Sequence, residues 1–375
     1  MTAPRSFSRL ALAVSASALS VIVGVIGAAS APSAVGAAGN TWTVVADNVQ
    51  APGYQTATVL ADGRVLAVGG QGTKAELFDP ATGTWTVAAD MNRSRAYATA
   101  TLLPDGEVLV AGGFDGSRPL ASAELYDPAA DHWTLTGSLA TGRLQHTATL
   151  LADGRVLVAG GTVAADNYTT PTATAELYDP ASGEFTPTGA MSRARAVFTA
   201  TLLLDGTVLV ADYGQTDLYD PASGQFTPTA PLPPDNDSIT AVRLHDGRVL
   251  SVGGSHGDTT AAEIYTPSTH TWQAAASLNW SRYLAPWGAV LLADGRVLVV
   301  GGTWSGKIAE TWDPAAGFWT KTGALFNTRT SNFGLARLND GRVLVDGGAE
   351  PDVWCDNEGG GCEVGPTHPA EIYTP

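Results

Sequence analysis

Short runs of alternating or wholly apolar residues recur along the chain, and turn sequences separate them. In one clear unit, residues 147–151 read Thr-Ala-Thr-Leu-Leu, an Asp-Gly turn follows, and residues 156–161 read Val-Leu-Val-Ala-Gly-Gly. A variable stretch then leads to Ala-Glu-Leu-Tyr-Asp-Pro at 175–180, a Ser-Gly turn and the aromatic residue Phe185. Such runs between glycine turns are typical of short antiparallel β-strands. The unit therefore predicts four strands, named a, b, c and d in chain order.

This unit is repeated along the chain. The turn Asp-Gly-x-Val-Leu occurs seven times at intervals of 41 to 52 residues, beginning at Asp62, Asp105, Asp153, Asp205, Asp246, Asp294 and Asp340. An aromatic residue also recurs once per unit in strand d, at Trp85, Trp133, Phe185, Phe226, Trp272 and Trp319. Self-similarity at this period indicates stacked repeats rather than independent domains. A residue repeated in every unit is best explained by packing between units.

The two ends of the chain complement each other. The last unit stops after its strand c, at residues 371–375, whereas Thr41-Trp42-Thr43 is a strand-d phrase without its own a, b and c strands. If Trp42 pairs beside Tyr373, the last unit gains its fourth strand and loses an exposed edge. We therefore predict an all-β, closed seven-bladed β-propeller with four antiparallel strands per blade, whose last blade is completed by the N-terminal strand.

Strand b ends in two glycines in six of the seven units, and this pair lets neighbouring chain segments approach closely. The fourth unit has Ala211-Asp212 instead. The double glycine, the later Tyr and Trp and the period resemble the kelch repeat, and the resemblance covers residues 40–375 almost completely. It implies that the b–c loops and d–a connections, which vary between blades, lie on one face around a central channel, where binding sites usually form.

Charge and the N-terminal residues bear on location and partners. The chain has 36 acidic and 20 basic residues, a formal net charge of −16, which argues against nucleic acid and anionic lipid as partners. Arg5 and Arg9, the apolar stretch from Leu10 to Ala29 and the small residues after it are typical of a secretory signal peptide at 1–37. An uncleaved anchor is the alternative. We expect a secreted, extracellular monomer that has no other membrane segment.

Residues that occur in only some blades are the candidates for binding. Arg95, Arg143 and Arg195 each stand ten residues before an Asp-Gly turn. They either pair with the acids that recur in strand c, at Glu76, Glu124, Glu176, Asp217, Glu263, Glu310 and Glu371, or form a basic arc for a carboxylate or sugar hydroxyls.

Aromatic residues gather in the last blades. Trp280 and Tyr283 lie in the connection to blade 6, and Trp304 and Trp354 lie in the b–c loops of blades 6 and 7. Exposed rings suit stacking on sugars or on partner side chains, and the alternative is that some of them cover the channel or loop backbone.

The last b–c loop contains Cys355 and Cys362, the only cysteines, which we predict to form a local disulfide in an oxidising compartment. Its acids between 352 and 363 lack the ordered spacing of a calcium loop, so a solvated acidic loop is the favoured interpretation. His146, His256 and His368 fall on three blades near the channel mouth, but we expect no metal site and no cofactor.

The closing blade also resembles that of the galactose oxidase propellers, in its cysteines within a Gly-rich loop before the last strand. The resemblance implies a copper site with Tyr and His shortly before the last Asp-Gly turn, where this chain has Ser331 and Asn332. We therefore expect neither bound copper nor copper-radical oxidation, and no catalytic residue is predicted. The leading hypothesis is a binding module for an extracellular glycan or protein, which uses the b–c and d–a loop face. The alternatives are a copper-free sugar isomerase or hydrolase at the channel mouth and a structural scaffold of the cell surface.

Overall fold

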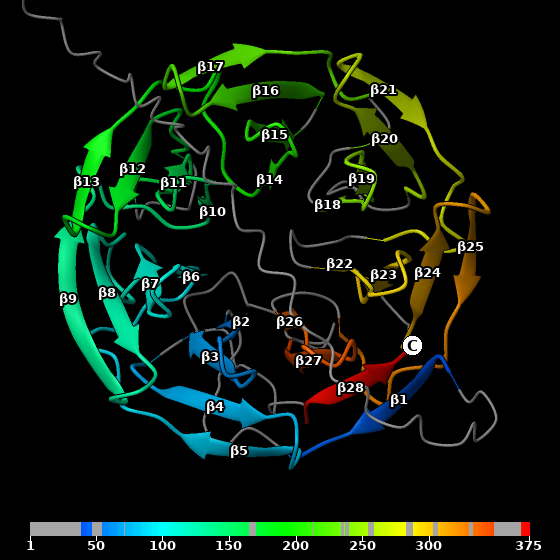
Figure 1. Cartoon of the computed structure of the whole chain (residues 1–375), viewed down its shortest axis with the longest axis horizontal. Helices are drawn as coiled ribbons and strands as arrows, with labels where there is room; N and C mark the ends of the chain where they lie inside the picture. Colours follow the sequence, from blue (N-terminus) through cyan, green and yellow to red (C-terminus); the bar gives the residue numbers. More distant parts are fainter. Residues whose placement is uncertain are drawn as a thin grey trace, which may run out of the picture. The chain divides into compact units, whose positions relative to one another are not determined.

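Seven sheets of four antiparallel strands form a ring, in the computed structural model shown in Figure 1. The structure describes residues 39–46, 55–70, 72–164, 170–212, 214–233, 236, 240–253, 259–282, 288–302, 307–329, 333–348 and 369–375. Residues 39–375 form one compact unit. The predicted signal peptide lies outside the described residues. The predicted seven-bladed, all-β propeller is confirmed.

Each blade runs from an innermost strand a to an outermost strand d. The innermost strands are β2 (Gln55–Val59), β6 (Thr99–Leu102), β10 (Thr147–Leu150), β14 (Thr199–Leu202), β18 (Thr240–Arg243), β22 (Ala289–Leu291) and β26 (Phe333–Arg337). The b strands are β3 (Val65–Gly69), β7 (Val108–Ala111), β11 (Val156–Ala159), β15 (Val208–Asp212), β19 (Val249–Val252), β23 (Val297–Val300) and β27 (Val343–Gly347).

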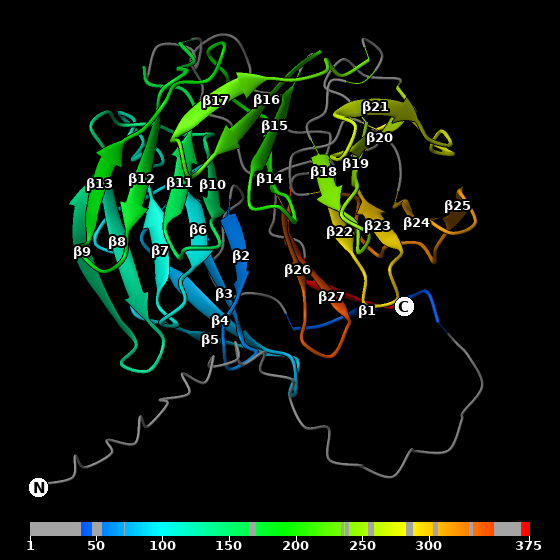
Figure 2. The same ribbon diagram turned by 45° about the horizontal axis from the view of Figure 1, so that its top comes forward.

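The outer half of each blade is built from strands c and d. The c strands are β4 (Ala75–Asp79), β8 (Ser122–Asp127), β12 (Ala175–Asp179), β16 (Gln215–Asp220), β20 (Ala262–Thr266), β24 (Ala309–Asp313) and β28 (Glu371–Thr374). The d strands are β5 (Thr84–Val87), β9 (His132–Ser138), β13 (Glu184–Pro187), β17 (Gln225–Pro228), β21 (Thr271–Ala274), β25 (Phe318–Lys321) and β1 (Thr41–Val44). Figure 2 shows inner strands such as β14 and β26 along the ring axis and outer strands such as β1 and β5 along the rim, as sheet twist requires.

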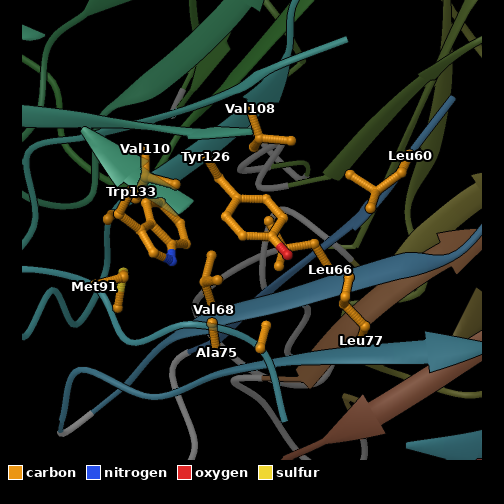
Figure 3. Packing of buried hydrophobic residues seen from close by; sticks show 12 residues of the cluster. Leu60, Leu66, Val68, Ala75, Leu77, Met91, Val108, Val110, Tyr126 and Trp133 are labelled. Atoms are coloured by element: carbon orange, nitrogen blue, oxygen red, sulfur yellow. The ribbon is translucent and has the colours of Figure 1, made fainter. Parts of the chain in front are cut away.

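The b strands are buried because neighbouring blades cover both of their faces. Between blades 1 and 2, Val68 and Val110 of two b strands pack with Tyr126 and Trp133 in one apolar cluster, shown in Figure 3. Trp133 is 5% exposed, and its Nε1 donates a hydrogen bond to the carbonyl oxygen of Ala89 in the preceding blade at 2.8 Å. The strand-d aromatic of blade 2 therefore joins neighbouring blades, as predicted.

The ring closes through the N-terminal strand. In Figure 1, β1 lies outside β28, and Trp42 pairs with Tyr373 in an antiparallel register, as predicted. Their ring centroids are 5.1 Å apart, and Trp42 is 6% exposed. Asn40 stabilises the pairing of β1 with β28 through two hydrogen bonds. Its backbone nitrogen donates to the Thr374 carbonyl oxygen at 2.9 Å, and its Oδ1 accepts a hydrogen bond from the Tyr373 hydroxyl at 2.5 Å. The innermost strands β2 and β26 also contact each other, which completes the inner circle.

The Asp-Gly turns have the geometry that their sequence predicts. Gly63, Gly106 and Gly154 have φ values of 91°, 94° and 87°, a backbone conformation that glycine adopts without steric cost. Among the described residues, no helix is long and apolar enough to span a membrane.

Trp42 provides a test of ring closure. We expect Trp42→Ala to lower the free energy of unfolding by about 3–5 kcal/mol, because the substitution removes a buried indole from the joint between the first and last blades. Val44 lies on the same strand but is 43% exposed, so Val44→Ala should cost less than about 1 kcal/mol. Urea denaturation measures both values, and equal losses would show that closure does not depend on the buried ring.

Candidate functional site at the loop face

The order of the strands decides which connections share a face. Because a, b, c and d are antiparallel in every blade, the a–b and c–d turns lie at one face of the ring, and the b–c and d–a connections lie at the other. We call the second face the loop face. It is where the resemblance to kelch propellers placed the variable connections.

The three candidate arginines lie beneath this face. Arg95 and Arg143 are 0% and 1% exposed, and they pair with Glu124 and Glu176 at N–O distances of 2.8 Å. Arg195 is also 1% exposed and pairs with Asp217 at 2.8 Å. Each of these acids lies on strand c, one of the two arrangements that the sequence left open.

The guanidinium group also satisfies main-chain carbonyl oxygens. Nη1 of Arg95 donates to the carbonyl oxygens of Gly112 at 2.9 Å and Ser122 at 2.6 Å, at the end of strand b and the start of strand c. Nη1 of Arg143 donates to those of Gly160 and Thr174 at 3.0 Å. The arginine thus joins its d–a connection to the end of strand b and the start of strand c. Burial lowers the pKa of the arginine, and the paired carboxylate opposes that change.

Two further buried arginines form equivalent ion pairs with strand-c acids in blades 6 and 7. Arg282 pairs with Glu310 at 2.9 Å and Arg329 pairs with Glu371 at 3.2 Å, and all four side chains are fully buried. The sequence comparison missed them because they stand twelve and eleven residues before their Asp-Gly turns rather than ten. A small residue directly precedes each of the five arginines, at Ser94, Gly142, Ala194, Ser281 and Thr328, and this was the available signal.

The strand-c acids also accept backbone hydrogen bonds. Glu124 Oε2 accepts from the backbone nitrogen of Asn92 at 2.7 Å, and Glu310 Oε2 accepts from that of Asn279 at 2.9 Å. In blade 5, Asn236 occupies the arginine position, and its Nδ2 donates to Glu263. The ion pair is therefore a scaffold element, which anchors the d–a connections that lead into blades 2, 3, 4, 6 and 7.

The burial of the three candidate arginines limits how they could act as the predicted basic arc for a ligand. The charges of Arg95, Arg143 and Arg195 are balanced by strand-c acids, and the side chains lie below the surface. Contact with a carboxylate or a sugar would require these side chains to reach the surface. Ligand recognition by the three arginines therefore stays a prediction.

Blade 4 departs from the pattern where its double glycine is missing. Asp212 is 2% exposed and forms ion pairs with Arg193 at 2.9 Å and Arg195 at 3.1 Å. Burial raises the pKa of the Asp212 carboxyl, and the two arginines oppose that shift. The extra carboxylate therefore replaces the close main-chain approach that glycine permits in other blades.

The predicted aromatic site is only partly described. Trp280 is half-buried on the connection to blade 6, and Lys321 Nζ lies 5.2 Å from the centroid of its ring. This cation–π contact places Trp280 against the outermost strand β25. Tyr283, Trp304 and Trp354 lie outside the described residues, as do Cys355 and Cys362 and the acidic loop around them.

His146 is buried near the inner edge of blade 3. It is 6% exposed, and its Nε2 lies 2.9 Å from Thr99 Oγ1 in blade 2. Burial, with a smaller contribution from the charge of Arg143, lowers the pKa of His146 to about 3. The ring packs on Gly112, where an added Cβ would lie 2.7 Å from His146 Cε1.

His146 occupies a position that holds phenylalanine elsewhere. Phe198 packs in the same way on Gly160, and Phe333 packs on Gly301, with an added Cβ 2.7 and 2.9 Å from the ring. The imidazole thus serves as a neutral, aromatic packing element. His256 and His368 lie outside the described residues. In the part of the chain that is described, no group of three or more His, Cys, Asp or Glu residues could hold a metal ion.

A set of residues that the sequence comparison did not single out lies at the inner end of the d–a connections. Tyr97, Gln145 and Val197 each stand two residues after a buried arginine and two before an innermost strand. All three have positive φ values, 58°, 54° and 55°. Their shared offset from Arg95, Arg143 and Arg195 was visible in the sequence, but their backbone conformation was not.

Comparisons with known proteins agree with this fold. The profile of the Kelch motif matches residues 95–139, while curated protein sequences give no match. The structure is similar to a fungal alcohol oxidase of the AA5 family solved in complex with copper, with a TM-score of 0.71 and 20% identity over 89% of this chain and 76% of the oxidase. It is also similar to YjhT, with a TM-score of 0.57 and 15% identity over 75% of this chain and 100% of that protein. The chain is a seven-bladed β-propeller that carries a Kelch motif at residues 95–139, and these structural likenesses concern its fold.

The residues of this chain do not fit the copper centre that the resemblance to galactose oxidase implies. Ser331 and Asn332 stand where Tyr and His are needed, and neither side chain is a strong copper ligand. Both positions lie outside the described residues. We derive no chemistry through copper.

The buried ion pair can be tested against an exposed one. We expect Arg143→Met to lower the free energy of unfolding by about 3–5 kcal/mol, because it leaves Glu176 as an unpaired buried carboxylate. Replacing both Arg143 and Glu176 by Met should lower the free energy of unfolding by less than Arg143→Met alone. The control is Arg155→Met in the Asp153 pair, whose side chains are 34% and 45% exposed; it should cost less than about 1 kcal/mol. Chemical denaturation that gave equal losses for the two single variants would contradict the scaffold role.

The buried imidazole predicts a pH dependence of stability. Unfolded histidine has a pKa of 6.5 and folded His146 about 3, so the unfolded chain binds more protons between these values. Stability is therefore complete above pH 6.5 and falls as the pH drops towards 3. His146→Phe keeps the packing seen at Phe198, so its loss of stability between pH 7 and 4.5 should be smaller than that of the original protein by about 2 kcal/mol. Parallel denaturation curves at both pH values provide the measurement; identical pH dependence would contradict the neutral, buried state.

Proposed function

We propose that this propeller is a secreted binding module that recognises an extracellular carbohydrate or protein through its loop face. The observation that carries the proposal is the contrast between the repeated, buried residues beneath this face and the variable residues of its connections. Buried arginine–acid pairs repeat from blade to blade and anchor the d–a connections, whereas the connections above them differ in length and sequence. Variable side chains on a rigid support are the usual arrangement of a binding surface.

The loops of blades 2 and 3 show how this surface is held. The b–c loop of blade 2 is bridged to the d–a connection, with hydrogen bonds between Ala96 and Phe114 in both directions at 2.8 and 2.9 Å. In blade 3, Leu144 and Thr162 form the equivalent bridge. The bridged residues are thus held in place before a ligand arrives, which reduces the entropy lost on binding.

The tip of the blade 2 loop is also organised by its own side chains. Asp115 Oδ1 accepts hydrogen bonds from the Ser117 hydroxyl at 2.7 Å and from the backbone nitrogens of Ser117 and Arg118 at 2.9 Å. The Ser117 hydroxyl bond is the largest cause of a pKa of about 2 for Asp115. The loop therefore keeps the same charge and shape throughout the pH range of extracellular fluids.

The experiment is a binding screen of the mature protein against glycan arrays and extracellular proteins, followed by titration calorimetry. A loop-face variant with Trp280, Trp304 and Trp354 all replaced by alanine should bind the resulting ligand at least about tenfold more weakly, as loss of central aromatic anchors does in other interfaces. Leu204→Ala provides the control, because Leu204 is 67% exposed beside an a–b turn on the opposite face.

Two outcomes would contradict the proposal. The first is a screen without any ligand, and the second is full affinity in the loop-face variant with loss in Leu204→Ala. If a bound sugar is converted to a new product, detected by mass spectrometry, the propeller is an enzyme rather than a binding module.

A further inference from the structure

Three side chains occupy backbone positions that their residue types disfavour. Among the described residues, six that are not glycine have positive φ, and Asn40, Asp131 and His270 belong to the types that tolerate this conformation best. The other three are Tyr97, Gln145 and Val197, which do not. Strained residues of this kind persist where the surrounding structure or the function retains them.

The three residues are joined into an arc. The backbone nitrogen of Gln145 donates to the carbonyl oxygen of Tyr97 at 3.2 Å, and that of Val197 donates to the carbonyl oxygen of Gln145 at 3.2 Å. Each hydrogen bond crosses from one blade to the next. The arc leads into β6, β10 and β14, the innermost strands of blades 2 to 4, which lie nearest the ring axis in Figure 1 and contact one another in sequence. It therefore follows the inner edge of the ring at the loop face.

The backbone of the arc is constant but its side chains are not. Glycine would meet the conformational requirement at each position, and the chain uses glycine at many other positive φ values, such as Gly112 and Gly160. Backbone geometry therefore does not account for a phenol, an amide and an isopropyl group at these three places.

Packing accounts for one of the three side chains. Val197 is half-buried and packs against the apolar cluster that includes Leu250 and Val252 of blade 5. Gln145 is also half-buried, yet its side-chain amide makes no hydrogen bond with any described residue. An amide at the inner edge of the ring without such a bond remains available to a ligand.

The charges of the two arginines next to the arc are neutralised, and this favours a neutral ligand. Arg95 and Arg143 lie two residues before Tyr97 and Gln145, but Glu124 and Glu176 neutralise them. The Gln145 amide both donates and accepts hydrogen bonds, and the next residue along the arc, Tyr97, has an aromatic ring. Hydroxyl groups on a ring with an apolar face complement this pair, whereas an anion would find no unpaired positive charge on these two arginines.

We infer that Gln145, next to Tyr97, contacts a neutral saccharide at the inner edge of the ring between blades 2 and 3. This inference rests on the proposed binding function and assigns its ligand class. It places the contact opposite the aromatic sector of blades 6 and 7, so the two can be tested independently.

The test combines stability with affinity. The probes are cellohexaose, xylohexaose, mannohexaose and chitohexaose, with hexagalacturonic acid as the anionic comparison. Gln145→Gly relieves the backbone, so its melting temperature should equal or exceed that of the original protein, while its Kd for the bound neutral probe should rise at least tenfold. Gln145→Glu removes the amide donor and adds a charge, and it should also weaken binding at least tenfold.

Val197→Gly is the matched control, because it relieves the same backbone strain but removes a packed side chain. It should lower the melting temperature and leave the Kd unchanged. A neutral probe bound with full affinity by both Gln145 variants would overturn this inference while leaving the proposed function intact. A lower melting temperature in Gln145→Gly with unchanged affinity, or binding of the anionic probe alone, would overturn it as well. Absence of binding to any glycan would overturn the saccharide assignment, and absence of any ligand in the wider screen would overturn the proposed function too.

Discussion

The buried pair between an arginine of one d–a connection and an acid on strand c of the next blade supports the loop face. A charged pair placed out of water must satisfy nearly all its hydrogen-bonding capacity, and Arg95 does so through Glu124 and the carbonyl oxygens of Gly112 and Ser122. The same groups then determine where the connection turns inward and where strand b ends. Asn236 in blade 5 shows that a neutral amide can hold the same place.

This support has a consequence for function. The buried arginines are paired with strand-c acids and anchor the connections. The surface residues above them can therefore vary, and the connections supply the side chains that a ligand would meet. In blades 2 and 3, main-chain hydrogen bonds join the b–c loops to the d–a connections and link Tyr97 to Gln145. In blade 4, Asp212 stands where other blades have glycine, and its carboxylate forms ion pairs with two arginines.

Ring closure is a second constraint, and it is local to one joint. Each of the first six blades is a continuous stretch of chain, but the last one combines β26, β27 and β28 with β1. Asn40 connects this joint to blade 6, since its carbonyl oxygen accepts a hydrogen bond from the backbone nitrogen of Gly323 at 3.0 Å. A small number of residues at the start of the ring therefore protects the final sheet from an unpaired edge.

The sequence by itself determined the architecture, because its repeat is carried by local signals. Each Asp-Gly turn, each apolar strand b and the incomplete first and last units can be recognised from neighbouring residues, and Trp42 opposite Tyr373 followed from counting them. Trp280, Tyr283, Trp304, Trp354 and the cysteine pair stay predictions, with only Trp280 among the described residues. The roles of the arginines needed the tertiary structure, because Arg95 and Arg329 meet acids 29 and 42 residues away in the next blade. Only the fold could also show that Gln145 holds a left-handed backbone against Tyr97 of a different blade, since no residue near it in the chain requires that conformation.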